Sequence, residues 1–188
     1  MEKKVKMELR VLRLDHRPGR DKRVSSHAAL VARAFGASGM IYTGVKDTSL
    51  EDSVNKVVKQ WGGDFFIRHA SSSWKRVISE HKQEGFTILH LTMYGMPFRD
   101  VVGKLIKESC PKILIIVGGS KVPSGVYDAC DHNVSVTNQP HSEIAALAVL
   151  LEHLGPGIEK VEAGFDNASR KIIPAERGKN VVQRSIRA

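Results

Sequence analysis

The sequence is poor in cysteine and contains none of the common metal-binding patterns. Its two cysteines, Cys110 and Cys130, do not form a CxxC pair, and no His/Cys group has zinc-site spacing. The eight histidines include no HExxH pair. We therefore expect reduced, partly buried thiols and no metal site.

Long apolar runs are also missing. No stretch reaches the roughly 18 apolar residues of a membrane span, and the first residues are mostly charged, unlike a secretory signal. With 41% hydrophobic and 26% charged residues, the chain has the composition of a folded domain. We expect a cytoplasmic protein with no membrane partner, a main domain over residues 1–157 and a dependent hairpin and basic tail over residues 158–188.

The phosphate-binding fingerprints of common nucleotide enzymes are absent as well. Residues 118–121 (GGSK) lack the spacing of both GxGxxG and GxxxxGK[ST]. This disfavours a nicotinamide or ATP site.

Positive charge, in contrast, is abundant. The net charge is +9 and the sequence pI is about 9.7. Arginines and lysines crowd two places, residues 10–23 and residues 170–187. Such clusters favour a polyanionic partner, most often nucleic acid, although a generally basic soluble protein remains an alternative.

Strand-like and helix-like segments alternate along the chain, which predicts an α/β fold with a mostly parallel sheet. The apolar run 113–117 (ILIIV) is typical of a parallel strand buried on both faces. The other predicted strands are 8–14, 40–42, 65–68, 86–91 and 133–136. The predicted helices are 25–35, 50–61, 74–81, 97–107, 123–130 and 142–154. Residues 16–25 are expected to form a basic loop, and 161–165 with 170–173 a hairpin.

The predicted helix 142–154 is apolar nearly all round. Ile144, Leu147 and Leu151 belong to one stripe, and Ala145 and Val149 to the opposite side. A helix of this kind must be covered on two sides. We expect the sheet on one side and a second subunit on the other, with a merely central helix as the alternative.

Three predicted strand ends carry residues suited to ligand binding: 91–95, 118–122 and 136–143. Ligands of parallel α/β sheets bind beyond the carboxyl ends of the strands. Glycines such as Gly118 and Gly119 let the backbone approach a ligand closely. These loops predict a ligand site in the C-terminal half of the chain.

Several long runs resemble the archaeal tRNA (cytidine-56-2′-O)-methyltransferase family, where 56 is the tRNA nucleotide. They are 16–27 (HRPGRDKRVSSH), 32–37, 61–63, 91–95, 117–123, 133–143 and 145–149. The resemblance extends from about Leu9 to Val181. One departure is the segment 118–121, where the family pattern has alanine and glutamate in the middle.

The resemblance implies a SPOUT-class α/β fold with a deep trefoil knot, a homodimer and S-adenosylmethionine as cofactor. The implied reaction is methylation of the ribose 2′-hydroxyl of cytidine 56 in tRNA. The alternatives are a non-catalytic tRNA-binding protein and another nucleotide-binding α/β enzyme. The implied cofactor-binding residues are Leu91, Gly118, Gly119, Ser120, Lys121, Val122, Val136, Thr137, Asn138, Gln139, Pro140, His141, Ser142 and Glu143.

The same resemblance places an arginine of the N-terminal motif near the target ribose. Arg23 is the expected catalytic residue together with Asn138. An arginine is effectively never deprotonated in a protein, so it would clamp a phosphate or a developing alkoxide rather than act as a base. The residues expected to bind RNA are Arg17, Arg20, Lys22, Arg23, Arg177 and Lys179.

Overall fold

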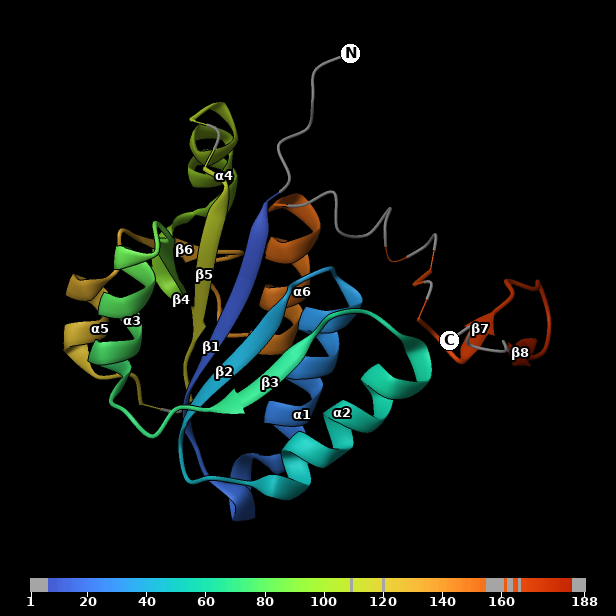
Figure 1. The fold of residues 1–188 in the computed structure, drawn as a ribbon. Helices are drawn as coiled ribbons and strands as arrows, with labels where there is room; N and C mark the ends of the chain where they lie inside the picture. Colours follow the sequence, from blue (N-terminus) through green and yellow to red (C-terminus); the bar gives the residue numbers. More distant parts are fainter. Residues whose placement is uncertain are drawn as a thin grey trace.

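The computed structural model describes residues 7–108, 110–119, 121–154, 161, 164–165 and 167–183. Six strands form one parallel sheet in the order β3-β2-β1-β5-β4-β6 (Figure 1). The strands of this sheet are β1 (Glu8–His16), β2 (Gly39–Gly44), β3 (Phe66–His69), β4 (Thr87–Pro97), β5 (Lys112–Val117) and β6 (His132–Ser135). The predicted α/β fold class is confirmed.

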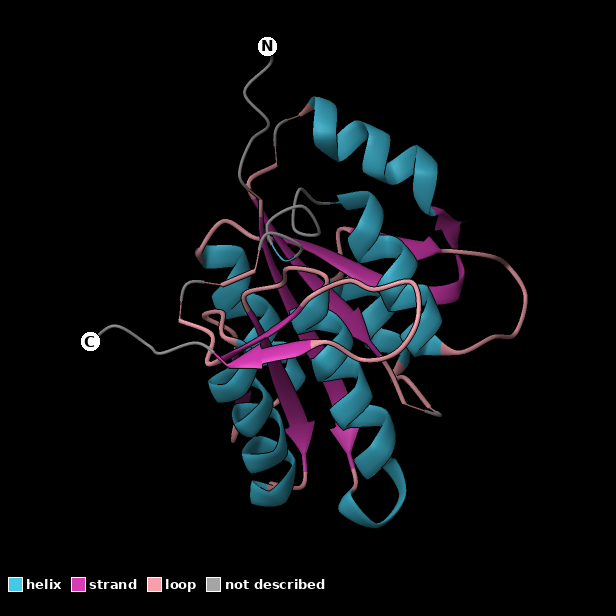
Figure 2. Cartoon of the chain, turned by 90° about the vertical axis from the view of Figure 1, so that its right-hand side faces the viewer, coloured by secondary structure: helices cyan, strands magenta, loops and turns pink. Residues whose placement is uncertain are grey.

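Helices cover both faces of the sheet (Figures 1 and 2). The helices are α1 (Pro18–Ala34), α2 (Thr48–Trp61), α3 (Trp74–Gln83), α4 (Phe98–Lys107), α5 (Ser124–Ala129) and α6 (Glu143–Leu154). Side chains of α1, α2, α4 and α6 share one apolar core with the sheet, and those of α3 and α5 share a second core on the opposite face. None of the described helices is long and apolar enough to cross a membrane.

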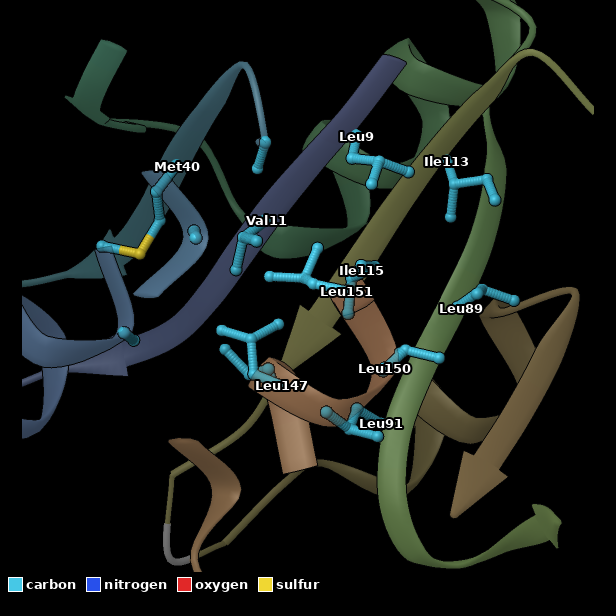
Figure 3. Close-up of a cluster of buried hydrophobic side chains, with 14 of the residues drawn as sticks. Leu9, Val11, Met40, Leu89, Leu91, Ile113, Ile115, Leu147, Leu150 and Leu151 are labelled. Atoms are coloured by element: carbon cyan, nitrogen blue, oxygen red, sulfur yellow. The ribbon is translucent and has the colours of Figure 1, made fainter. Parts of the chain in front are cut away.

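The centre of the sheet explains why the fold forms. All five residues of the run 113–117 are buried, and β5 pairs with β1 on one side and β4 on the other. In Figure 3, Leu147, Leu150 and Leu151 of α6 lie over Val11 and Ile115 of the central strands. Burial of a large aliphatic side chain contributes about 1.5–3 kcal/mol, so this layer is a main source of stability.

Alternation along β1 places its side chains on opposite faces of the sheet. Leu9 and Val11 belong to the core under α1 and α6, whereas Leu12 and Leu14 belong to the core under α3 and α5. Arg13 falls on the first of these faces and is 1% exposed. A charged side chain is therefore buried in β1 on the same face as Leu9 and Val11.

The predicted basic loop at residues 16–25 is wrong. Helix α1 begins at Pro18, so most of this segment forms its first two turns. Proline suits the first position of a helix, where no backbone N–H is needed. Arg17 also donates to Asp21 at 2.9 Å, which links the N-cap residue to the first turn. The expected cap at Ser25 or Ser26 is replaced by this start.

The predicted hairpin is also corrected. Its strands are β7 (Arg170–Ile172) and β8 (Val181–Gln183), which pair antiparallel. The expected partner 161–165 lies partly outside the described residues, and residues 161, 164 and 165, which are described, are not in a strand. Short alternating segments match several partners equally well, so local pattern alone did not select the pairing. Figure 2 shows the hairpin in front of the helices.

Two glycines at the end of α2 bring the C-terminal segment against the main domain. Gly62 and Gly63 have φ values of 73° and 92°, which favour glycine. The backbone N–H of Gly63 donates to Asn167 at 2.8 Å, and a Cβ at Gly62 would lie 2.6 Å from the same side chain. The buried Arg33 donates to the Gly62 carbonyl at 2.5 Å and lies over the ring of Phe165.

Candidate active site

One cavity lies at the carboxyl ends of β4 and β6, beside the start of α6. It has a volume of about 110 Å³ and is open to solvent. Its lining residues are Leu91, Thr92, Met93, Val136, His141, Glu143 and Ala146. Four of them, Leu91, Val136, His141 and Glu143, were predicted to bind the cofactor. We call this space the knot-loop cavity, after the loops that the family resemblance assigns to the expected knot.

Arg13 links the knot-loop cavity to the loop after β5. Its guanidinium donates to the carbonyl oxygen of Gly118 and lies 3.2 Å from the Glu143 carboxylate. The side chain is buried, and its Nε has no hydrogen-bond partner among the described residues. Sequence reasoning counted Arg13 in the basic cluster of residues 10–23, although its alternation with Leu9 and Val11 along a predicted strand was the signal for burial.

The electrostatics of Glu143 depend on this arginine. Burial raises the pKa of the Glu143 carboxyl, the nearby Arg13 charge lowers it, and Asp21 raises it. Glu143 is half-buried, whereas Asp21 is buried and is held by Arg17. The hydrogen bond from Arg17 is the main cause that lowers the pKa of Asp21. A buried row of alternating charges thus runs from the start of α1 to the start of α6.

The loop after β5 depends on its first glycine. Gly118 is buried, and a Cβ there would lie 2.1 Å from Cγ2 of Val122. At Gly119, in contrast, a Cβ would lie 3.9 Å from both the Arg13 guanidinium and the Leu14 carbonyl, which is ordinary contact distance. Ser120 lies outside the described residues. The fold of this loop on itself therefore requires glycine at position 118.

Not every predicted cofactor residue faces the knot-loop cavity. Lys121 is exposed and lines a different cavity, described below. Thr137, Gln139, Pro140 and Ser142 are exposed in the segment that joins β6 to α6. This segment flanks the cavity, since Val136 and His141 at either end of it are lining residues.

Asn138 connects two of the three predicted loops. Its side-chain amide donates to the carbonyl oxygens of Met93 at 2.8 Å and Gly95 at 3.0 Å. Met93 and Gly95 belong to the end of β4, which runs beyond the predicted limit at Leu91 to Pro97. With both N–H groups directed to this strand, the Oδ1 atom is the group left to accept a hydrogen bond from a ligand.

The four basic residues predicted to bind RNA near the N-terminus lie on the first turns of α1. Arg20, Lys22 and Arg23 are exposed, and Arg17 is half-buried through its ion pair with Asp21. No described residue accepts a hydrogen bond from the Arg23 guanidinium. This end of α1 lies at the carboxyl edge of the sheet (Figure 1).

The basic residues of the tail lie elsewhere. Arg177 and Lys179 are exposed in the connection between β7 and β8. Figure 1 shows the hairpin beside the end of α2, on another side of the chain from the start of α1. Arg177 and Lys179 therefore do not meet the basic residues at the start of α1 within a single chain.

A hydrogen-bonded histidine anchors the start of α1. His16 is fully buried, with Nδ1 at 2.8 Å from Ser25 Oγ and Nε2 at 3.3 Å from Asp47 Oδ2. Asp47 caps α2 by accepting from the N–H of Leu50. The Ser49 hydroxyl is the main cause that lowers the pKa of Asp47. This serine–histidine–aspartate arrangement is buried, so it holds α1, β1 and α2 together rather than offering a nucleophile.

A second cavity lies at the carboxyl ends of β1, β2 and β3, next to the start of α3. Its volume is about 510 Å³. The lining residues include Asp15, Thr43, His69, Ser71, Ser72, Ser73, Trp74 and Lys121. Sequence reasoning missed this site, because the polar segment 71–73 reads as an ordinary loop. We call this space the Trp74 cavity.

The chain is similar in sequence to a known protein family and to individual proteins of several archaea. Residues 61–182 match the sequence profile of the family described as "tRNA ribose 2'-O-methyltransferase, aTrm56". The chain is 50% identical to a tRNA (cytidine(56)-2'-O)-methyltransferase of Archaeoglobus fulgidus, over 94% of this chain and 99% of the relative. It is 49% identical to the protein of that name from Methanosphaera stadtmanae, over 92% of this chain and 97% of the relative.

Solved structures agree on the fold. The A. aeolicus TrmH/SpoU tRNA modifying enzyme is similar with a TM-score of 0.57 and 16% identity, covering 84% of this chain and 79% of that one. The SpoU methyltransferase AviRb from Streptomyces viridochromogenes, solved in complex with AdoMet, has a TM-score of 0.57 and 16% identity, covering 85% of this chain and 60% of that one.

Proposed function

This chain belongs to the family of tRNA ribose 2′-O-methyltransferases, and on that premise we propose how it acts. It transfers a methyl group from S-adenosylmethionine to the ribose 2′-hydroxyl of cytidine 56 in tRNA. The observation that carries this conclusion is the identity of about half of all residues, over nearly the whole length, to relatives named for that reaction.

The residues of the knot-loop cavity suit the cofactor. Leu91, Val136 and Ala146 give apolar walls, and the Glu143 carboxylate gives a negative charge next to them. A sulfonium or ammonium cation is stabilised by such a charge. A volume of about 110 Å³ holds one end of the molecule, and the exposed segment 137–142 supplies backbone groups for the rest.

Arg13 preorganises the residues proposed to bind the cofactor. By donating to the Gly118 carbonyl and pairing with Glu143, it fixes the loop after β5 relative to the start of α6. It also favours the ionised form of Glu143 against the effect of burial. A preorganised negative charge costs little rearrangement when a cation binds.

When bound, S-adenosylmethionine supplies an electrophilic methyl group. The chain must then align the ribose oxygen and help remove its proton, and alignment alone can supply much of the rate. We assign Arg23 to the RNA at this step, where its guanidinium binds a phosphate or the developing alkoxide. Asn138 orients the ribose or the cofactor through Oδ1 while its amide N–H groups hold β4.

Phosphate groups of the tRNA would contact the exposed first turns of α1. Arg20 and Lys22 lie there beside Arg23, with Arg17 one turn earlier. Arg177 and Lys179 of the hairpin connection form a second contact. Since the two sets lie on different sides of one chain, a single tRNA would reach both most simply across two subunits.

A homodimer would also cover the outer face of α6. Leu147, Leu150 and Leu151 are buried against the sheet, whereas Ala145 and Val149 remain exposed on the same helix. An exposed apolar helix face is a preferred association surface. The SPOUT fold of the structural relatives supports the proposed trefoil knot at this end of the chain. A tRNA substrate supports the proposal of a cytoplasmic enzyme.

The test is transfer of a labelled methyl group to an unmodified tRNA transcript. A matched transcript carrying 2′-deoxycytidine at position 56 is the control. We expect label in the first transcript only. Binding of both transcripts without transfer to either would instead identify a non-catalytic tRNA-binding protein.

A further inference from the structure

The Trp74 cavity borders the connection between β5 and α5, which Arg13 also contacts through the Gly118 carbonyl. Leu14 and Asp15 line it from β1, and Lys121 and Pro123 line it from the connection between β5 and α5. A Cβ at Gly119 of the same connection would lie 3.9 Å from the Leu14 carbonyl oxygen. A ligand in this cavity would therefore touch the loop that the cofactor site also uses.

Asp15 has the one positive φ among the described non-glycine residues, at 51°. It lies where the register of β1 and β2 shifts between Arg13 and His16, so β1 carries a bulge there. Gly44 permits this shape, because a Cβ at that position would lie 2.5 Å from the backbone of His16. Bulges and left-handed residues are costly, and they frequently redirect a side chain at a functional site.

The bulge leaves the carboxylate of Asp15 exposed at the cavity. Among the described residues, no side-chain or backbone donor forms a hydrogen bond with this carboxylate. The pKa of Arg17 is raised mainly by Asp21, and the charge of Asp15 contributes less. The guanidinium of Arg17 already donates to Asp21, so Asp15 keeps its acceptor oxygens for a ligand.

The opposite wall offers donors for an anion. Ser71, Ser72 and Ser73 lead into α3, and none of their hydroxyls has a hydrogen-bond partner among the described residues. Ser73 is the N-cap of α3, whose first free N–H groups face outward from the helix start. Lys121 adds an exposed ammonium group to the same cavity. Serine hydroxyls, helix N–H groups and a lysine together suit a phosphate.

Trp74 supplies an aromatic wall between these two polar parts. It is half-buried, with its ring edge 3.5 Å from the position of a Cβ at Gly125. Single-stranded RNA is bound by stacking of unpaired bases on such rings and by hydrogen bonds to base edges. An acidic acceptor, an aromatic ring and a phosphate seat in about 510 Å³ match the parts of one nucleotide.

We propose that the Trp74 cavity binds an unstacked nucleotide of the tRNA substrate, with its phosphate at Ser71–Ser73 and Lys121, its base against Trp74 and a base amino group on Asp15. The assignment of the RNA as ligand rests on the proposed function. A carboxylate accepts from an exocyclic amino group, which adenine, cytosine and guanine carry and uracil lacks. The site therefore favours a base with an amino group over uracil.

The test uses the full chain with substitutions that the backbone tolerates. Glycine adopts a φ of 51° without strain, so Asp15→Gly removes the carboxylate while keeping the bulge. Asp15→Asn removes the same charge with a side chain of the same size. Its matched control is Asp52→Asn on the exposed face of α2, because a glycine at position 52 would damage that helix. Trp74→Phe keeps a ring, and Trp74→Leu keeps bulk without one.

We expect Asp15→Gly and Trp74→Leu to raise the KM for tRNA about tenfold, the size of one good base contact. The KM for S-adenosylmethionine should change less than twofold, and Trp74→Phe and Asp52→Asn should behave as wild type. The direction of the change in tRNA KM is informative. Loss of a negative charge by itself strengthens non-specific binding to a polyanion and would lower this KM. Unchanged tRNA KM in both Asp15→Gly and Trp74→Leu would overturn the proposal.

A second measurement does not depend on catalysis. In a Trp61→Phe variant, Trp74 is the remaining tryptophan of the chain, and its fluorescence should be quenched when tRNA binds. Quenching by cytidine monophosphate but not by tRNA would overturn RNA as the ligand and indicate a free nucleotide. Quenching by tRNA without any methyl transfer would reject the proposed reaction while keeping this site.

Discussion

The Arg13 guanidinium lies 3.2 Å from the Glu143 carboxylate, joining β1 to the start of α6 beside the knot-loop cavity, which Glu143 lines. Arg13 is 1% exposed and also donates to the Gly118 carbonyl. One buried side chain therefore holds two of the three loops that the sequence analysis singled out. This relationship leads to the first three predictions.

Glu143→Gln should weaken S-adenosylmethionine binding about tenfold. The substitution preserves shape but removes the negative charge beside a cationic ligand, and tenfold corresponds to about 1.4 kcal/mol. Titration calorimetry measures the affinity. Glu152→Gln, on the exposed side of the same helix, serves as the control and should bind normally. Equal affinity for all three proteins would remove Glu143 from the cofactor site.

Arg13→Met should lower the free energy of unfolding by about 3 kcal/mol. Removing one partner of a buried ion pair leaves the other uncompensated, which is strongly destabilising. Arg76→Met is the control, because Arg76 pairs with Glu80 at the surface of α3, where the two side chains are 73% and 47% exposed. Surface pairs contribute about 0–1 kcal/mol. Urea denaturation of both variants measures the free energy of unfolding. Similar losses in the two variants would show that the Arg13–Glu143 pair stabilises the fold no more than a surface pair does.

As the pH is lowered, the affinity for S-adenosylmethionine should begin to fall at a higher pH than it would beside a glutamate of ordinary pKa. Burial raises the pKa of Glu143 above 4.5, so its ionised form is lost earlier as pH falls. The sign for stability is opposite, because a raised carboxyl pKa favours the folded state most when the group is protonated. In Arg13→Met the affinity loss should begin at a still higher pH, since Arg13 lowers this pKa.

Calorimetry from about pH 7 to about pH 4 tests this order. Glu143→Gln, which has no carboxyl at this position, should lack the transition. A wild-type transition at or below 4.5, or the same transition in Glu143→Gln, would assign the pH dependence to another group.

Ser25→Ala should destabilise the fold by about 1–3 kcal/mol, the cost of leaving a buried polar group unsatisfied. Ser25 is fully buried and its hydroxyl meets Nδ1 of His16 at 2.8 Å. The neighbouring Ser26 is only half-buried and donates to the Arg23 carbonyl, so Ser26→Ala should cost less than about 0.5 kcal/mol. Denaturation curves for the two alanine variants distinguish them, and equal stability would mean that His16 finds another partner.

Val149→Lys should separate the proposed dimer into monomers. Val149 is 37% exposed on the outer face of α6, so a lysine fits a single chain but places a charge in an apolar interface. Sedimentation velocity measures the mass. Glu152→Lys, also exposed on α6, is the control for a new lysine on this helix. A wild-type chain that sediments as a monomer would contradict the dimer directly.

Much of this architecture could be predicted from local pattern. The apolar run 113–117 correctly indicated a strand buried on both faces, and alternation along β1 placed Arg13 on the face of Leu9 and Val11. The three strand-end loops were recognised because parallel sheets bring the carboxyl ends of strands to one edge. Leu91, Val136 and Glu143 accordingly line one cavity.

The remaining features depend on contacts between distant segments. The start of α1 at Pro18 is supported by the His16 contact to Asp47, which lies on another element. The pairing of β7 with β8 across residues 173–180 was not distinguishable from a tighter hairpin by pattern alone. The Trp74 cavity requires β1, β3 and the β5 connection to meet, and no periodicity in the sequence encodes that meeting.

A crystal structure of the chain with S-adenosylmethionine would test the central claim most directly. We predict the sulfonium beside Glu143, with Leu91 and Val136 against the ligand and the first turns of α1 bordering the methyl group. Density for the ligand away from these three residues would contradict the account of the site.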